Sequence, residues 1–182
     1  MTIRIPKRVA VPLGAVLATC VLSGTAAAVL TSDTGGAEIR VDKRQENVLR
    51  TTSSTAWQDL PGANVRVFVP ANTSRLYDVP FFAESRCSGP QGGLCNVRII
   101  ATHLASGNSV ELKPQSGVDY GFDTDIPGAL DDFYEGHGME RSHRLPGGSA
   151  GTAYAIRVQW RVANPTSVFQ LDDWHLAVHT NV

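Results

Sequence analysis

The chain has 182 residues, of which 42% are hydrophobic and 18% are charged. This composition is too apolar for a disordered protein, and the length suits one domain with a processed segment. The formal net charge of −1 excludes the strongly basic balance of a nucleic-acid-binding domain, so no nucleic-acid partner is expected.

Residues 1–28 have the pattern of a secretory signal peptide. A basic start without acids precedes an uncharged apolar stretch that ends in the alanines at 26–28. We predict a signal helix that is cleaved after Ala28, so that the mature protein is secreted, extracellular or attached to the cell surface. Loss of its three basic residues takes the net charge from −1 to −4. Two alternatives stay open: an uncleaved membrane anchor, since about 20 apolar residues span a bilayer, and a lipid on Cys20.

Residues 29–50 are polar, with scattered apolar positions. This composition predicts a linker that leads from the cleavage point to the domain. Within the linker, the run AEIRVDKRQENVLR at 37–50 is predicted to form a short helix. The folded domain is expected to cover residues 51–182.

From Thr51 onward, apolar and polar residues alternate with the period of two that is typical of half-buried strands. The predicted strands include ANVRVFVP at 63–70, CNVRIIATH at 95–103 and TAYAIRVQWRVA at 152–163. In the last of these, Arg157, Gln159 and Arg161 form the polar face and Trp160 lies on the apolar face.

The final run, SVFQLDDWHLAVHT at 167–180, changes phase. Phe169 stands in one phase of the alternation and Trp174 in the opposite one. One extra residue at Asp172–Asp173 explains the change, so we predict a β-bulge there. The alternative is a strand that starts at Asp173 and leaves Phe169 in a loop.

Turn signals separate the strands: PGAN, SGPQGG, ASGN, LPGGSAG and ANPTS. No run after Thr51 has the periodicity of an amphipathic helix. Many short strands joined by Gly, Pro and Asn turns predict an all-β fold, namely an antiparallel two-sheet β-sandwich of the jelly-roll kind.

Cys87 and Cys95 are predicted to form a disulfide bond. The Ser, Gly and Pro residues between them let the chain turn back, and export brings the protein into oxidising surroundings. A metal-binding cysteine pair is the alternative, but the sequence holds no second pair to complete such a site.

The run GGSAG at 147–151 fits G-x-S-x-G, the nucleophile motif of many serine hydrolases. That motif requires a strand before the serine and a helix after it, whereas Ser149 precedes a predicted strand. We therefore interpret the run as a turn, and the sequence predicts no catalytic residue.

The sequence predicts no obligatory cofactor, but two clusters are candidate sites for zinc or calcium. His137, Glu140 and His143 suit zinc by type, although on a strand Glu140 points away from the two histidines. Carboxylates in a loop suit calcium, although the EF-hand spacing is broken here. The candidate calcium loop holds Asp119, Asp123 and Asp125. For both clusters the alternative is a solvated loop or sheet rim.

Tryptophan side chains suit stacking on sugar rings as well as core packing. Trp160 and Trp174 lie on the apolar faces of predicted strands, so we expect both in the core. Trp57 precedes the first predicted strand, and the choice between the two roles stays open for it.

Five runs share a pattern with other proteins: TTSSTAWQDLPG, AESRCSG followed by LCNVRI, YEGHGMERSHRL, VQWRV and FQLDDWHLAV. Together they resemble a recurring family of secreted proteins from high-GC Gram-positive, actinobacteria-like organisms, over roughly residues 48–180. The resemblance implies an exported β-sandwich and brings no active-site residues with it.

No sequence feature names a ligand. Polar strand faces near Arg157 and His175, with the loops around His137, indicate a binding or interaction module. The expected partners are a cell-surface glycan, a protein or further copies of the chain, with membrane contact only through an uncleaved N-terminal segment. Two alternatives stay open: a metal-assisted extracellular hydrolase using His137, Glu140 and His143, and a passive structural domain.

Overall fold

The computed structural model describes residues 37–89, 93–117, 120–124 and 133–182. The predicted signal peptide therefore lies outside the described residues. Within the described ranges there are ten strands and no helix, and hence no helix that is suited to cross a membrane. The strands are β1 (Glu38–Glu46), β2 (Arg50–Thr52), β3 (Gln58–Val69), β4 (Ser74–Ser88), β5 (Leu94–His103), β6 (Ser109–Glu111), β7 (Asp123–Thr124), β8 (Glu135–Pro146), β9 (Thr152–Val162) and β10 (Val168–Asn181).

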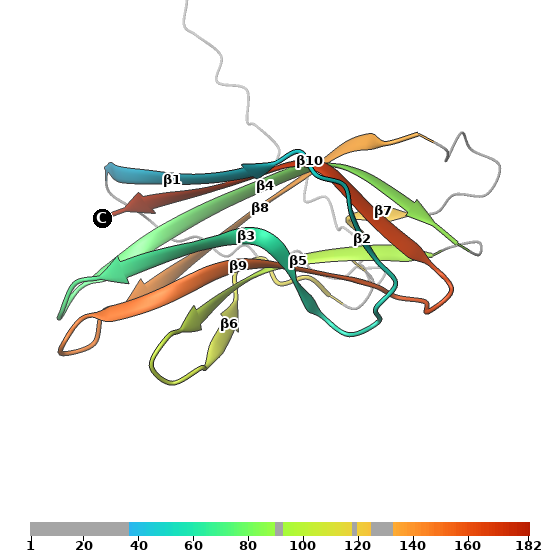
Figure 1. Cartoon of the computed structure of the whole chain (residues 1–182). Coiled ribbons are helices and arrows are strands. Elements are labelled where there is room, and N and C mark those ends of the chain that lie inside the picture. Colours follow the sequence, from blue (N-terminus) through green and yellow to red (C-terminus); the bar gives the residue numbers. More distant parts are fainter. Residues whose placement is uncertain (1–36, 90–92, 118–119, 125–132) are drawn as a thin grey trace, which may run out of the picture. The chain divides into compact units, whose positions relative to one another are not determined.

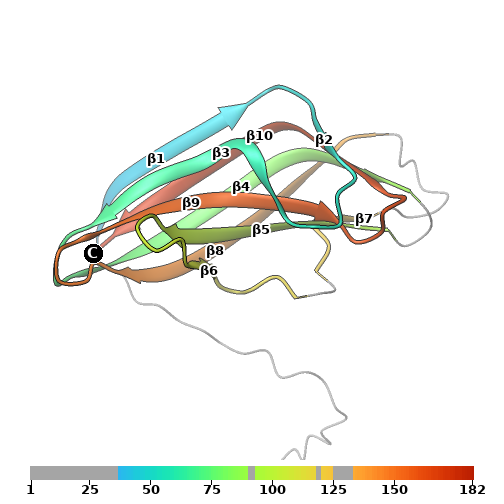
Figure 2. The same ribbon diagram turned by 60° about the horizontal axis from the view of Figure 1, so that its bottom comes forward.

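Two antiparallel sheets form the two layers that are visible in Figures 1 and 2. Sheet A has the order β1-β10-β4-β8, with β2 also paired to β10. Sheet B has the order β3-β9-β5-β6, with β7 also paired to β5. The eight principal strands are thus divided equally between the sheets, and the first lies beside the last, as in a jelly roll. The predicted all-β fold, a two-sheet sandwich of the jelly-roll kind, is confirmed.

Strand β1 corrects the interpretation of residues 29–50. The helix predicted over 37–50 is wrong, because Glu38–Glu46 pair with β10 as the edge strand of sheet A. Most of this strand is exposed, so its sequence does not need the apolar alternation of a half-buried strand. Charged residues are common on edge strands because they oppose pairing with another chain. Among the described residues, the folded domain therefore includes β1 in addition to the expected residues 51–182.

The core lies between the two sheets and is built from the alternating faces that the sequence indicates. Phe81 is fully buried, with its ring centroid 5.8 Å from that of Phe122 and 6.4 Å from that of Trp174. Trp160 and Trp174 are buried in this core, as predicted. The other buried residues of the predicted strand faces include Val65, Val67, Val69, Val97, Ile99, Ala101, Tyr154, Ile156, Val158, Val162, Leu171, Leu176 and Val178.

The predicted β-bulge is present in β10. The register of β10 against β4 shifts between Asp172 and His175, and Asp173 has a positive φ of 44°. Phe169 before the bulge and Trp174 after it are both buried, and both belong to the same strand. The extra residue therefore keeps both halves of β10 facing the core, and the alternative that leaves Phe169 in a loop is wrong.

The predicted disulfide between Cys87 and Cys95 is confirmed, with a Cα–Cα distance of 5.8 Å. It joins β4 of sheet A to β5 of sheet B, so it links the two layers. Lys113, which follows β6, and Ser142 on β8 exchange two backbone hydrogen bonds of 2.8 Å and link the layers again. Both links lie away from β1 and β3, the strands at the opposite edge of the two sheets.

The hydroxyl group of Tyr77 is buried and has no hydrogen-bond partner among the described residues. Burial raises the pKa of the Tyr77 phenol from 10.0 to about 12, because the ionised form is poorly solvated there. An unpaired buried polar group costs about 1–3 kcal/mol, so we expect Tyr77→Phe to leave stability unchanged or to raise it.

The same hydroxyl makes stability depend on pH. The unfolded phenol ionises near pH 10 and the folded one near 12, so stability is full below pH 10 and falls as the pH rises to 12. We expect the free energy of unfolding of Tyr77→Phe to fall less than that of the wild type between these pH values. Urea unfolding at about pH 8 and about pH 11 measures the difference. Tyr154, whose pKa burial also raises, remains in both proteins and serves as the internal reference. Equal losses of stability in the two proteins would contradict the assignment of this pH dependence to Tyr77.

Candidate functional site

A row of four residues crosses the outer face of sheet A from one edge to the other. Gln45 on β1 pairs with His175 on β10, and His175 pairs with Phe82 on β4. Phe82 in turn pairs with Gly138 on β8. Phe81, next to Phe82, points into the core, so the row lies on the outer face. We name these four residues the aromatic row.

Phe82 is the exposed aromatic residue of the row, with 54% of its surface accessible. A Cβ atom added at Gly138 would lie 2.5 Å from Cδ1 of Phe82, so the ring lies over the glycine. A cross-strand pair of an aromatic residue and a glycine covers the sheet backbone and holds the ring in place. The row therefore presents a fixed apolar surface beside the imidazole of His175 and the amide of Gln45.

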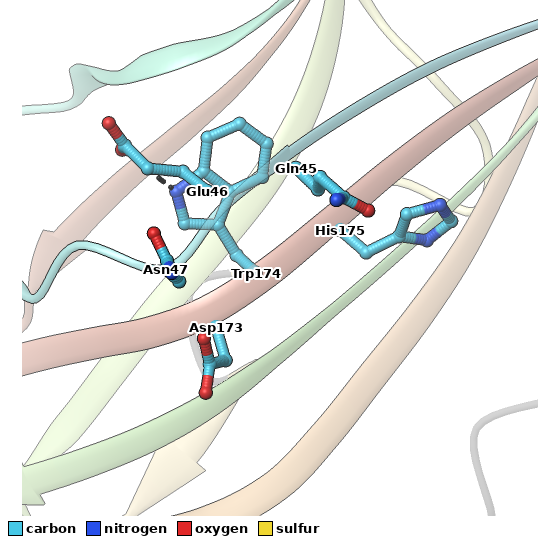
Figure 3. Close-up of a pocket in the computed structure, with 6 residues that line it drawn as sticks. All are labelled: Gln45, Glu46, Asn47, Asp173, Trp174 and His175. Atoms are coloured by element: carbon cyan, nitrogen blue, oxygen red, sulfur yellow. Dashed lines mark hydrogen bonds between the residues drawn. The ribbon is translucent and has the colours of Figure 1, made fainter.

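An open pocket of about 340 Å³ adjoins the row at the β-bulge (Figure 3). It shares Gln45 and His175 with the aromatic row, and its size is at the lower end of the ~300–1,000 Å³ of small-molecule sites. We name it the bulge pocket. The residues that line it are Gln45, Glu46, Asn47, Asp173, Trp174 and His175.

The walls of the bulge pocket are held by polar contacts. The indole N–H of Trp174 donates to Oε2 of Glu46 at 3.3 Å, and Arg50 donates to both oxygens of Glu46, at 3.0 and 2.6 Å. These hydrogen bonds from Arg50 lower the pKa of the Glu46 carboxyl group. Figure 3 shows Gln45 and His175 side by side, turned away from the indole. The indole of Trp174 is buried, so the groups that the pocket offers are polar: the carboxylate of Glu46, the amide of Gln45 and the imidazole of His175.

His137 of the candidate zinc cluster and Asp123 of the candidate calcium loop both contact Ser85. The hydroxyl of Ser85 donates to Oδ2 of Asp123 at 2.7 Å, and its oxygen lies 2.8 Å from Nδ1 of His137. Because the single hydroxyl proton is directed at Asp123, His137 must donate from Nδ1 to the serine oxygen. Oε2 of Glu135 lies 3.9 Å from the other ring nitrogen of His137.

This cluster has the residue types of a serine-hydrolase triad but not its arrangement. In a triad the aspartate contacts the histidine, and the histidine accepts the serine proton. Here Asp123 contacts Ser85 itself, and Ser85 is only 1% exposed, out of reach of a substrate. The three side chains therefore tie β4, β7 and β8 together and do not form a nucleophile.

The candidate zinc ligands are spread along β8 and are not brought together. His137 and His143 lie on one face of the strand, about 20 Å apart at the rise of an extended chain, and Glu140 is exposed on the other face. Met139 between them is buried. Over the part of the chain that the structure describes, no three His, Cys, Asp or Glu side chains are grouped to hold a metal ion.

The candidate calcium loop is only partly described. Asp123 is the residue that binds Ser85, whereas Asp119 and Asp125 lie outside the described residues. Ser149 is exposed in the turn between β8 and β9, two strands that belong to different sheets. The interpretation of GGSAG as a turn that precedes a strand is thus confirmed.

Phe82 was not among the residues predicted from the sequence, although one signal for it was present. Phe81 and Phe82 are adjacent, and neighbouring side chains on a strand point to opposite faces. One phenylalanine of the pair had to face outward wherever that strand lay. The partners of Phe82 on the other three strands depend on register, which a single sequence does not give.

No protein-family model matches the chain, and no curated protein matches its sequence. A solved structure that is similar holds the CBM22-1–GH10 modules of the N-terminal endo-1,4-β-D-xylanase 10B of Clostridium thermocellum, complexed with xylohexaose. The identity is 10% and the TM-score is 0.30, and the match covers 78% of this chain and 29% of that one. This chain therefore spans less than a third of that chain, and the match is too weak to carry an argument about function.

Proposed function

We propose that the chain is an exported binding module that recognises a neutral glycan on the outer face of sheet A. Export is inferred from the signal-peptide pattern of residues 1–28. The observation that carries the proposed ligand is the exposed ring of Phe82, which is continuous with the bulge pocket through His175 and Gln45.

The chemistry of this surface suits a sugar ring. A pyranose has an apolar C–H face, which stacks on an aromatic ring, and a rim of hydroxyl groups that donate and accept hydrogen bonds. Phe82 supplies the aromatic surface, while His175 and Gln45 supply donors and acceptors beside it. Because Gly138 fixes the ring, little side-chain entropy is lost when the ligand binds.

The charge around Phe82 favours a neutral ligand. Glu84 lies two residues along β4, Asp172 on β10 pairs with Glu84, and Glu140 on β8 pairs with Pro80. The outer positions directly beside Phe82 on β4, β8 and β10 hold no Lys or Arg, and the nearest described cations on this face are Arg86 on β4 and Lys43 on β1. An anionic polymer would be repelled from this surface, whereas a neutral polysaccharide would meet hydrogen-bond acceptors.

Affinity electrophoresis through gels that contain neutral polysaccharides tests the proposal. We expect retardation of residues 29–182 by at least one member of a panel of xylan, mannan, galactan, arabinogalactan and β-glucan. Phe82→Ala should weaken binding about tenfold or more, because aromatic stacking contributes about 0.5–1.5 kcal/mol beyond the buried area. The matched control is Phe68→Ala, since Phe68 is 61% exposed but belongs to sheet B.

A pair of glycine variants tests the position of the ring without removing it. In Gly138→Ala the new methyl group would collide with Phe82 and displace its ring, whereas at Gly136 a Cβ meets nothing within 4 Å. We expect Gly138→Ala to lose binding and Gly136→Ala to keep it. Binding that is unaffected by Phe82→Ala, or no retardation by any polysaccharide of the panel, would refute the proposed function.

A further inference from the structure

Two arginines of sheet B stack on one tryptophan. The guanidinium carbon of Arg98 lies 4.4 Å from the centroid of the Trp57 ring, and that of Arg161 lies 4.5 Å from it. Arg98 is on β5, Arg161 is on β9, and Trp57 directly precedes β3. Stacking on an indole ring holds both guanidinium groups in place on the outer face of the sheet.

The positive charge of this cluster is only partly balanced. Arg98 lies 3.8 Å from Glu111 and donates to Gln159, so part of its charge is compensated. Arg161, by contrast, forms no ion pair with any described residue, and its Nε atom is buried without a hydrogen-bond partner. Among the described residues of this face, the other acid is Asp59, which is engaged with Arg157 at 2.5 Å.

The two guanidinium groups also affect each other. Burial lowers the pKa of Arg98; Glu111 opposes that change, and the positive charge of Arg161 adds to it. Two like charges held against one ring repel each other, and an anion bound close to both would relieve that repulsion. The side-chain oxygen of Asn96, which is across the strand pair from Arg161, likewise has no hydrogen-bond partner among the described residues. Because Nε of Arg161 is buried, the two terminal NH₂ groups of the guanidinium are the donors that a ligand could reach.

We propose that Arg98 and Arg161, supported by Trp57, form a site for an anionic oxygen group of an acidic polymer, either a phosphodiester or a carboxylate. Guanidinium groups match both oxyanions through paired hydrogen bonds, and their stacking on indole keeps the donors oriented. The site lies on the outer face of sheet B and is therefore separate from the aromatic row on sheet A.

NMR titration of residues 29–182 at low ionic strength tests this site. The probes are tripolyphosphate for the phosphate group and oligogalacturonate for the carboxylate group. We expect the Nε–Hε signals of Arg98 and Arg161 to shift with at least one probe. The probe that binds more strongly shows whether the site prefers a phosphate or a carboxylate group. Arg161→Gln should weaken binding about tenfold, because charge-assisted hydrogen bonds are lost. Arg161→Lys should give an intermediate loss, since it keeps the charge without the planar stack.

The control is Lys43→Gln, which removes the same charge from β1 of sheet A. We expect it to change the affinity for either probe by no more than about twofold, since salt screens distant surface charges. Equal losses in Lys43→Gln and Arg161→Gln would mean that binding follows net charge, and would overturn the proposal, as would the failure of both probes to bind. The retardation of the protein by polysaccharide, which depends on Phe82, should be unchanged in Arg161→Gln. The proposed glycan site and the proposed anion site can therefore fail independently.

Discussion

Phe81→Ala is expected to lower the free energy of unfolding by about 4 kcal/mol. Phe81 has no exposed surface, and its ring packs against Phe122 and Trp174 between the two sheets. Truncation removes the buried ring and leaves a cavity that the strands on either side cannot close. A domain of this size is stabilised by only about 5–15 kcal/mol, so urea unfolding should show a large shift of the midpoint.

Phe82→Ala is the matched control, because the same residue type is removed from the next position of the same strand. Its ring is on the outer face, so we expect a change within about 0.5–1 kcal/mol. The two variants should therefore separate stability from ligand binding: one loses stability, and the other loses retention by polysaccharide. Similar losses of stability in both would show that the faces of β4 are wrongly assigned.

Removal of the disulfide is expected to have the second largest effect on stability. The bond closes a short loop between β4 and β5, with a sequence separation of 8. The loop-closure entropy of so short a loop corresponds to about 2.5 kcal/mol, so Cys87→Ala/Cys95→Ala should lose roughly that amount. Protein collected outside the cell should begin at Val29, and its intact mass should be two hydrogen atoms lower than that of the dithiol.

Reductant provides the control for this experiment. It should lower the stability of the wild type towards that of the double variant and leave the double variant unchanged. A double variant that is as stable as the oxidised wild type would show that the link between the layers contributes nothing. A native mass with both thiols free would show that the bond does not form during export.

Much of the fold follows from local alternation, because a strand with one buried face must alternate. The run from Tyr154 to Val162 and the phase change at Asp172–Asp173 are of this kind. β1 is different, since an edge strand with few buried residues has no apolar face to reveal. β4 also conceals its pattern, because Leu76-Tyr77 and Phe81-Phe82 place apolar residues side by side.

The candidate sites could not be assembled from the sequence in the same way. Each residue of the aromatic row comes from a different strand, and only the pairing register brings them into line. The stack of Arg98 and Arg161 on Trp57 likewise joins three segments. Local patterns indicated polar faces near Arg157 and His175 but gave no contacts between strands. Residue type alone also suggested zinc ligands along β8, where strand geometry holds them apart.

The links between the layers are unevenly placed, and this has a dynamic consequence. The disulfide and the paired backbone groups of Lys113 and Ser142 fasten the β4–β8 side, whereas a single side-chain hydrogen bond of 3.1 Å, from Thr52 on β2 to Gln58 on β3, is described between the layers on the β1–β3 side. A pocket of about 280 Å³ lies on the β1–β3 side, lined by residues of both strands, among them Arg44 and Arg66. Thermal fluctuations should therefore separate the two sheets first between β1 and β3, while the β4–β8 side stays closed. Water should enter the core first between β1 and β3.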